Sequence, residues 1–253
     1  EMSRKMADDI KQLQNLNDQL IRTEKLAAMG TLASGVAHEV NNPLASISSL
    51  IQMMQSNQNL DETTTENLRL IQTQIQRITQ VTKDMMDFAR VRPAAKSWLD
   101  INEISETALR LASFDKSFQR LQINKVYGEN LPKIFADADQ LQQVFLNLFL
   151  NARDAMPNGG NLFIKTSSDE NNIFIEIADN GIGIEEGSLK HIFDPFFTTK
   201  PTGKGTGLGL AVCYGIITAH GGKIVVMDNN GKGSRFIISI SIGESSDSFP
   251  SIA

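Results

Sequence analysis

The stretch "LQQVFLNLFLNARDAM", residues 141 to 156, predicts a helix that is apolar almost all round and carries one polar stripe. Spacings of four, four and three residues place the members of the stripe on one helix face: Gln143, Asn147, Asn151 and Asp154. Asparagine is a poor helix former, and a buried amide needs a hydrogen-bonding partner. Two interpretations follow: the stripe faces water or a neighbouring loop, or it offers oxygen ligands to a hard cation such as Mg²⁺.

A mixture of helix and strand patterns surrounds this helix from residue 99 onward. Helical periodicity covers 101–116, 137–156 and 208–219. Alternation of apolar and polar residues predicts strands at 121–127, 161–168, 172–178, 223–227 and 234–241. Because the two patterns do not alternate strictly, we expect an α+β sandwich with one sheet face covered, rather than a doubly wound sheet.

The stretch "IADNGIGI", residues 177 to 184, follows one of these strands. Asp179 stands at the strand end, where a carboxylate accepts hydrogen bonds from an exocyclic amine. Gly181 and Gly183 allow close approach of the backbone to a flat ligand. An ordinary Asn-Gly turn is the alternative interpretation.

The stretch "FDPFFTTKPTGKGTGLGLAV", residues 193 to 212, joins an apolar phenylalanine segment to a glycine-rich one. Gly205, Gly207 and Gly209 expose backbone N–H groups at the start of a helix, which suits phosphate binding. Leucine at position 208 excludes G-x-G-x-x-G, and glycine after Lys204 excludes the G-x-x-x-x-G-K-[ST] loop. A surface loop without a ligand is the alternative.

Residues 22 to 90 predict a helical hairpin. Its first helix repeats apolar residues at three and four: Leu26, Met29, Ala33, Val36, Val40, Leu44, Ile47, Ile51 and Met54. After the polar "QSNQNLDETTTE", the second helix does the same: Leu68, Ile71, Ile75, Ile78, Thr82, Met85 and Ala89. One hairpin does not bury both stripes, so two copies should form a four-helix bundle in a homodimer. The stretch "RVRPAAKSW", 90 to 98, predicts a linker.

The first hairpin helix carries "GVAHEVNNPL", residues 35 to 44. His38 lies about 200° round the helix from Val36, off the apolar stripe, so its ring should face solvent. A neutral imidazole is a good nucleophile near its pKa of about 6.5. Glu39 can hold the second ring N–H or accept a proton. Without other evidence, the alternative is a plain surface pair. Pro43 should bend the helix beyond this pair.

Composition narrows the class of protein. With its net charge of −5, the chain lacks the excess of basic residues that is typical of nucleic-acid-binding proteins. Cys213 is the one cysteine, which excludes an intrachain disulfide and favours a reducing, cytoplasmic setting. No run of about 18 apolar residues is present, so we expect no membrane contact by this segment. Because the chain starts inside a helical pattern, we expect it to belong to a longer protein, whose anchor and sensor would lie upstream.

Taken together, the motifs resemble those of the sensor histidine kinases of two-component signalling, over roughly residues 22 to 242. Five stretches match the family boxes in order: "AHEVNNPL" the H-box, "NLFLNA" the N-box, "DNGIGI" the first glycine box, "FDPFFTTK" the F-box and "GTGLGL" the second glycine box. Two alternatives remain open, namely a non-kinase ATPase of the same superfamily and a scaffold that binds ATP without phosphorylating itself. The first normally lacks "HEVNNP" on a dimerising hairpin.

The resemblance implies a fold, a domain order and a reaction. A dimerising helical hairpin precedes an ATP-binding α/β sandwich, and the γ-phosphoryl of ATP passes to His38 and then to an aspartate on a response regulator receiver domain. The same domain can act as the regulator's phosphatase, with Asn42 orienting water. The domains would be a coiled-coil signalling helix (1–21), the dimerisation and phosphotransfer domain (22–92), a linker (93–98), the catalytic domain (99–243) and a tail (244–253).

The resemblance also assigns residues to ATP and Mg²⁺. Asn151 would ligate Mg²⁺, with Asn147 near the metal or phosphates and Asp154 on the same face. Asp179 would bind the adenine amine, beside Gly181 and Gly183. Lys200 and the stretch 198–206 would form the ATP lid, and the second glycine box would meet the phosphates through Gly205, Thr206, Gly207, Leu208 and Gly209.

One departure from the family pattern stands out. Many members carry Lys and Tyr three and four residues after the second N-box Asn, where this chain has Asp154 and Ala155. Arg153 is a weak candidate for the missing positive charge. His191 and His220 match no acceptor position, and we expect a surface role for the first and a helix-end role, favoured by the dipole, for the second.

Overall fold

The computed structural model describes residues 40–55, 60–89, 95–200, 205–229 and 232–242. The predictions for residues 1–21, His38, Glu39 and the tail 244–253 lie outside this part. The chain divides into two compact units, one of residues 1–92 with 194–209 and one of 93–193 with 210–253. Each unit is described by itself.

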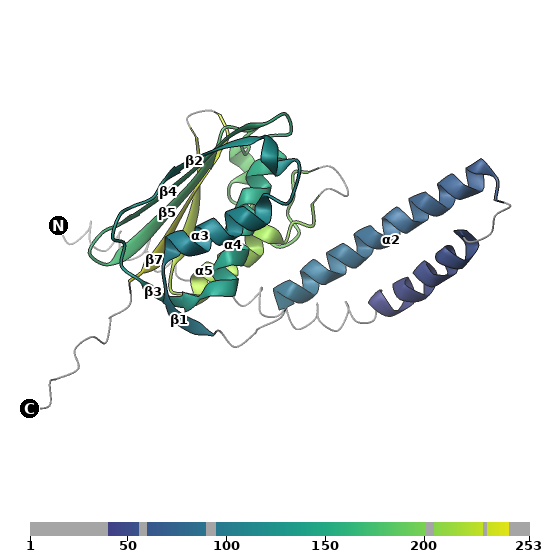
Figure 1. Ribbon diagram of the computed structural model, residues 1–253, viewed down its shortest axis with the longest axis horizontal. Coiled ribbons are helices and arrows are strands. Elements are labelled where there is room, and N and C mark those ends of the chain that lie inside the picture. The colour runs from purple at the N-terminus through teal and green to yellow at the C-terminus, as the bar shows by residue number, and fades with distance from the viewer. Residues whose placement is uncertain (1–39, 56–59, 90–94, 201–204, 230–231, 243–253) are drawn as a thin grey trace, which may run out of the picture. The chain divides into compact units, whose positions relative to one another are not determined.

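The first unit contains the predicted helical hairpin (Figure 1). A helix over 40–55 packs against α2 (Glu62–Ala89) through a small cluster of buried side chains: Leu44, Ile51, Leu68 and Ile75. Asp61 caps α2 by accepting a 2.7 Å hydrogen bond from the backbone N–H of Thr64. A second tie joins the helices near their other ends, where the Thr82 hydroxyl donates to Asn41 Oδ1 at 2.7 Å.

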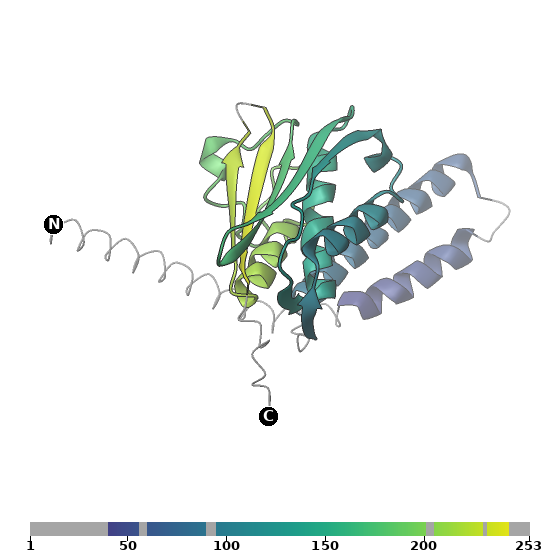
Figure 2. The same cartoon turned by 60° about the vertical axis from the view of Figure 1, so that its left-hand side comes forward.

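The second unit is a two-layer α/β sandwich, as predicted. Its sheet has the order β2-β4-β5-β7-β6, with β2 parallel to β4 and the other pairs antiparallel. The strands are β2 (Leu121–Val126), β4 (Gly160–Ser168), β5 (Asn172–Asp179), β6 (Lys223–Asp228) and β7 (Ser234–Ser241). Figures 1 and 2 show three helices on one face of this sheet: α3 (Ile101–Ala112), α4 (Ala138–Ala155) and α5 (Gly209–Ala219).

Strand alternation sends one set of side chains into the helix layer. Burial alternates along β4, β5 and β7, as the period-2 pattern predicted. The buried face of the sheet includes Leu162, Ile164, Ile173, Ile175 and Ile177, and α4 contributes Leu141, Val144, Phe145, Leu148 and Phe149. Phe145 and Phe149 stack at 6.2 Å between ring centroids, and Phe118 meets Phe149 at 6.4 Å.

Three elements differ from the sequence-based expectation. Strands β1 (Lys96–Leu99) and β3 (Ile134–Asp137) pair antiparallel, although β3 was not predicted and 90–98 was predicted as linker. The helix expected over 101–116 ends at Ala112, because Ser113 forms its C-cap. The chain then makes a 3₁₀ turn η1 (Phe118–Arg120), and a second one, η2, spans Glu186–Ser188.

Asp137 is the junction between the paired strands and two helices. One of its carboxylate oxygens caps α4 by accepting from Gln140 N at 3.0 Å, and the other accepts from Ala95 N at 2.8 Å. Its own N–H donates to His220 Nε2 at 3.0 Å, just beyond the end of α5. Because the other ring nitrogen lies 2.8 Å from the Ile216 carbonyl, which only accepts, His220 is a neutral Nδ1–H tautomer. The helix-end position was predicted correctly, and two hydrogen bonds hold the ring there.

Among the described residues, no helix has an apolar stretch long enough to cross a lipid bilayer.

Candidate functional site

The polar stripe of α4 lies at the margin of the sandwich core. The helix buries Leu141, Val144, Phe145, Leu148, Phe149 and Ala152, whereas the stripe residues Asn147, Asn151 and Asp154 are half-buried. A position between core and solvent is where amide and carboxylate oxygens remain accessible to a ligand and are still held by a rigid helix. The spacing argument therefore placed these residues on one partly accessible face, as expected.

Asn147 has a neighbour that the sequence did not reveal. Its side chain hydrogen-bonds to the thiol of Cys213 on α5, and the Cys213 sulfur lies 3.7 Å from the Val144 carbonyl oxygen. Burial raises the pKa of the Cys213 thiol to about 12, and the Asn147 contact acts in the opposite direction. The thiol is thus a neutral, buried group, as predicted for a small apolar cysteine.

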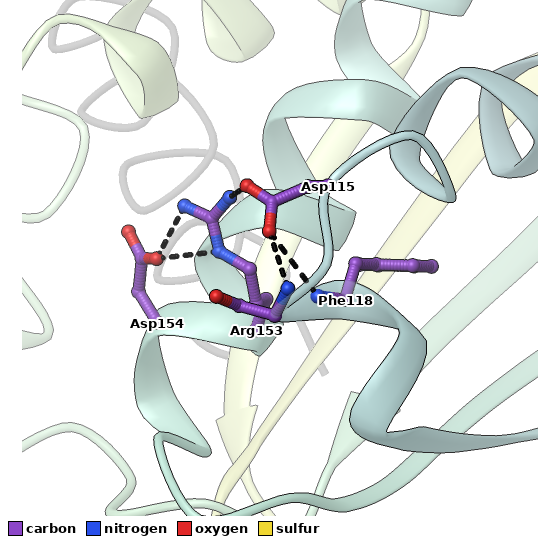
Figure 3. Close-up of polar contacts among 5 residues, drawn as sticks. Asp115, Phe118, Arg153 and Asp154 are labelled. Carbon is purple, nitrogen blue, oxygen red and sulfur yellow. Dashed lines mark hydrogen bonds and ion pairs between the residues drawn. The ribbon is translucent and has the colours of Figure 1, made fainter.

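Arg153 does not point along the stripe as a spare positive charge. Its guanidinium lies between Asp115 and Asp154 (Figure 3). Nη1 donates to Asp115 Oδ2 at 2.5 Å, and Nε and Nη2 both donate to Asp154 Oδ1. Arg153 is therefore committed to two carboxylates, and the weak hypothesis that it replaces the family lysine receives no support.

Asp179 ends β5 and is only 3% exposed. Its Oδ1 accepts from Gly181 N at 2.8 Å and from Ser234 N at 3.3 Å, while Oδ2 accepts from the Ser234 hydroxyl at 2.5 Å. A buried carboxylate requires such donors, because an unpaired charge in the core is costly. These bonds fix the orientation of the carboxylate and leave it at the end of the strand, where the predicted ligand would meet it.

The sequence did not point to the residues that surround Asp179. Ser234 begins β7, and the Asn229 amide donates to the Asp179 carbonyl oxygen at 2.8 Å. Gly233 has φ +84°, and a Cβ on it would lie 2.0 Å from the Asp179 carbonyl oxygen. These residues stand about 50 positions after Asp179, and only a serine and a glycine at a strand start hinted at them.

Both glycines of "DNGIGI" are needed for contacts within the protein. A Cβ on Gly181 would lie 2.5 Å from the Ala155 carbonyl oxygen, which accepts a 3.1 Å hydrogen bond from Ile182 N. Gly183 has φ +74° and approaches the backbone of Gly233. We expected these glycines to admit a flat ligand, and their first physical requirement is close packing of the loop against α4 and the start of β7.

The segment 194–209 brings the F-box and the second glycine box together. Gly207, at φ +69°, has no room for a Cβ beside the backbone of Phe196, which itself has φ +65°. A Cβ on Gly205 would lie 3.0 Å from both Thr198 Oγ1 and Lys200 Cδ, and Lys200 N donates to that hydroxyl at 3.2 Å. The two flanks of the predicted lid thus meet, while residues 201–204 lie outside the description.

The remaining site residues of this segment follow directly in the chain. Thr206 is half-buried and the Leu208 side chain is buried, so only the Leu208 backbone is a candidate for ligand contact. Gly209 opens α5, close to the predicted start at 208.

The acceptor region of the hairpin is described from residue 40 onward. Asn42 and Pro43 are exposed on the helix 40–55, and the Asn42 carbonyl accepts a 3.4 Å hydrogen bond from the Ser46 hydroxyl. The adjacent Asn41 faces α2 through its bond to Thr82. Solvent therefore reaches the side of the helix that carries Asn42.

Two family models match the chain. Residues 28–94 match the His Kinase A (phospho-acceptor) domain, and residues 136–244 match the histidine kinase-, DNA gyrase B- and HSP90-like ATPase. Sensor histidine kinase ZraS of Escherichia coli K12 is 36% identical over 225 residues, covering 89% of this chain and 48% of that protein. Sporulation kinase C of Bacillus subtilis is 35% identical over 235 residues, covering 92% and 53%. The chain thus spans about half the length of these curated relatives.

Solved structures agree on the architecture. Histidine kinase ThkA in complex with the response regulator protein TrrA is 25% identical, with a TM-score of 0.64 over 91% of this chain and 67% of that one. Full-length ShkA in complex with AMPPNP has a TM-score of 0.67 at 22% identity, over 83% of this chain and 45% of that one, which shows likeness of fold.

Proposed function

The chain belongs to the sensor histidine kinases of two-component signalling, and from this premise we propose that it is the kinase core of a longer signalling protein. In the proposed reaction, a bond forms between an imidazole nitrogen of His38 and the γ-phosphorus of ATP, while the bond to the ADP oxygen breaks. The phosphoryl group then passes to an aspartate carboxylate on a response regulator receiver domain. The observation that carries the proposal is the order of the two matches: residues 28–94 enclose His38, and residues 136–244 enclose Asn147, Asn151 and Asp179.

The proposed adenine site is the Asp179 carboxylate at the end of β5. Hydrogen bonds from Gly181 and Ser234 hold the carboxylate in one orientation, so it is prepared to accept from an exocyclic amine. The rigid loop of Gly181 and Gly183, tied to Ala155 and Gly233, would form the wall beside the base. The backbone amides between Gly205 and Gly209 would meet the phosphates at the start of α5.

Mg²⁺ would be held by Asn151, with Asn147 beside it. Among the described residues no group of three His, Cys, Asp or Glu side chains forms a metal site. The candidate donors on α4 are the amide oxygens of Asn147 and Asn151, which suit a hard ion that takes its other ligands from water and from the nucleotide phosphates. Such an ion, when bound, supplies charge neutralisation at the transferring phosphoryl group.

His38 is the proposed acceptor, and Glu39 the group that holds its second ring nitrogen or accepts a proton. Asn42, one helical turn further, is exposed on the helix 40–55. We extend the proposal to phosphatase activity, in which Asn42 orients a water molecule toward the phosphoaspartate of the regulator. An Asn42→Ala variant should then dephosphorylate the regulator more slowly than the parent, and an unchanged rate would contradict this role.

A homodimer is supported by the split of the hairpin's apolar pattern into two sets. One set recurs every seven residues and is buried within the hairpin: Leu44, Ile51, Leu68, Ile75 and Thr82. The other set recurs at the same interval and is 42 to 58% exposed: Ile47, Met54, Ile71 and Ile78. Seven-residue spacing keeps a set on one side of a helix. The second set should therefore face a second copy, which completes a four-helix bundle.

We also propose a cytoplasmic location for this segment, since ATP and receiver domains are found there, within a protein that can be anchored in a membrane by other parts. The net charge of −5 agrees with the absence of a nucleic-acid partner.

The test is incubation of the chain with γ-labelled ATP and Mg²⁺. We expect an acid-labile label that is lost in His38→Gln and retained in His191→Gln, a control in the sandwich. ATP binding without any label would make the chain an ATP-binding scaffold instead. Transfer of the label to a panel of purified receiver domains then identifies the regulator, and failure to label any member would contradict the second step.

A further inference from the structure

The end of α4 contacts two other parts of the sandwich through hydrogen bonds and ion pairs. It carries Asn151, the proposed Mg²⁺ ligand. Two residues later Arg153 reaches across to Asp115, which lies in the connection between α3 and β2. The Ala155 carbonyl oxygen, at the end of the helix, accepts from Ile182 N in the first glycine box.

The Asp115 side chain is 39% exposed, but backbone hydrogen bonds hold its carboxylate in one orientation. Its Oδ1 accepts backbone hydrogen bonds from Ser117 N at 2.7 Å and Phe118 N at 3.4 Å, contacts visible in part in Figure 3. Those amides, with Arg153, hold the pKa of Asp115 below its usual value. Phe118 is 2% exposed and packs on Phe149 of α4. Asp115 is thereby connected to the core of the sandwich.

Arg153 completes a bridge between Asp115 and the polar stripe. Isolated surface ion pairs contribute little, because solvent screens them and long side chains lose entropy. Here the Arg153 side chain is 21% exposed, against 39% for Asp115 and 27% for Asp154. Its guanidinium contacts both carboxylates at once, and backbone amides hold that of Asp115. A planar guanidinium with several donors is suited to such a bridge.

We infer that Arg153 is a positioning residue for nucleotide binding: the Asp115–Arg153–Asp154 bridge holds the last turn of α4, and through it both Asn151 and the first glycine box. The mechanical link to the glycine box is direct, because Gly181 packs so closely on Ala155 that a Cβ would lie 2.5 Å from its carbonyl oxygen. A shift of this turn must therefore move the loop. Arg153 also forms an ion pair with Asp154 on the same polar stripe.

The inference rests on the proposed function, and the test separates the two. The full chain is compared with Arg153→Met, Arg153→Lys, Asp115→Asn and the control Arg110→Met. Arg110 is an exposed arginine of the same sandwich, whose guanidinium donates to Thr107 on its own helix. Three quantities are measured: the affinity for Mg²⁺ with AMPPNP by calorimetry, KM and kcat of autophosphorylation, and amide hydrogen exchange at Ile182.

Loss of a group that orients metal ligands typically weakens binding or activity about 10- to 100-fold, so Arg153→Met should weaken AMPPNP binding about 10-fold. KM for ATP should rise more than kcat falls, since the lost contacts position the nucleotide before reaction. Asp115→Asn should show a smaller loss, and Arg153→Lys should recover part of it. Exchange at Ile182 should accelerate in Arg153→Met and Asp115→Asn, but not in Arg110→Met.

A merely structural arginine would lower the melting temperature and leave AMPPNP affinity and Ile182 exchange at the parent values below the transition, which would overturn the inference. Equal effects of Arg153→Met and Arg110→Met would do the same. If the parent itself neither binds AMPPNP nor takes up label, the proposed function fails, while accelerated Ile182 exchange would still report the bridge.

Discussion

The hairpin and the sandwich bury their apolar side chains to very different extents. In the described part of the hairpin, Leu44, Ile51, Leu68 and Ile75 form the whole buried apolar cluster, and an equally regular set stays exposed. In the sandwich, the apolar faces of three helices and a five-stranded sheet cover each other. The hairpin therefore needs a second copy to bury its apolar side chains, whereas the sandwich has a complete core of its own. We expect dimerisation to depend on the hairpin and nucleotide binding to depend on the sandwich.

The largest expected effect comes from charging the exposed set of the hairpin. Ile71→Glu combined with Ile78→Glu removes four isoleucine side chains from the predicted dimer interface. At about 1.5 kcal/mol or more for each, the dimer loses on the order of 6 kcal/mol, or about 10⁴-fold in dissociation constant. Sedimentation velocity should show a monomer that still binds AMPPNP.

The matched control introduces glutamate at two other exposed apolar positions of the hairpin. Met53 and Leu70 are 67% and 57% exposed and lie outside the seven-residue set. Met53→Glu with Leu70→Glu should leave the dimer intact. If both pairs of substitutions dissociate the dimer equally, the division of the hairpin into two sets is wrong.

A cavity in the sandwich core should lower the stability of the sandwich and leave the dimer intact. Phe149 is fully buried between Phe145 and Phe118, so Phe149→Ala should cost about 3–5 kcal/mol in the free energy of unfolding. Urea unfolding followed by circular dichroism should show this loss in the sandwich transition, with dimerisation unchanged. Loss of the dimer in this variant would show that the two units are not independent.

The methyl group added by Gly233→Ala should displace the backbone beside Asp179. Gly233→Ala imposes a side chain at φ +84° and 2.0 Å from the Asp179 carbonyl oxygen, which costs about 2 kcal/mol or more. The backbone of Asp179 and Ser234 must move apart, so AMPPNP affinity should fall. Gly187→Ala is the matched control, because a Cβ there meets nothing within 4 Å. Equal AMPPNP affinities of the two variants would argue against Asp179 and its neighbours as the nucleotide site.

The sequence predicted those parts of the molecule that repeat along the chain. Helical periodicity located the hairpin and α4, and alternation located β4, β5 and β7. Strands β1 and β3 were missed because four residues each, "KSWL" and "IFAD", are too few for a periodic signal. Their pairing is fixed by Asp137, which connects residues 42 positions apart.

The sequence pointed to candidate site residues that lie within one motif. It did not point to residues distant in the chain that hydrogen-bond to them or pack against them. Asp179 was identified, whereas Ser234 and Gly233 were not, since nothing near Asp179 in the chain points to them. Likewise, Arg153 was noticed as a charge, but its partner Asp115 lies 38 positions earlier, and only the fold brings the two together. His38 and Glu39 stay predictions from their motif.

The smallest expected effect is a pH dependence confined to the sandwich. Burial, with a smaller contribution from nearby Glu106, raises the pKa of Tyr127 from its ordinary value of 10 to about 12, while the hydrogen bond with Ser105 acts in the opposite direction. Between these values the unfolded chain has lost the phenolic proton while the folded chain keeps it. The contribution of Tyr127 to stability is therefore complete below pH 10 and declines as the pH rises toward 12.

Comparison of the parent with Tyr127→Phe isolates this contribution from the other groups that titrate in alkali. At pH 9 the variant should be about 1 kcal/mol less stable, because it loses the 3.0 Å hydrogen bond between the Tyr127 and Ser105 hydroxyls. Between pH 9 and 11 the parent should lose more stability than the variant, so the two converge. Both tyrosines of the chain, Tyr127 and Tyr214, belong to the sandwich. Convergence should therefore appear in the sandwich transition alone, and convergence in the hairpin transition would contradict the independence of the two units.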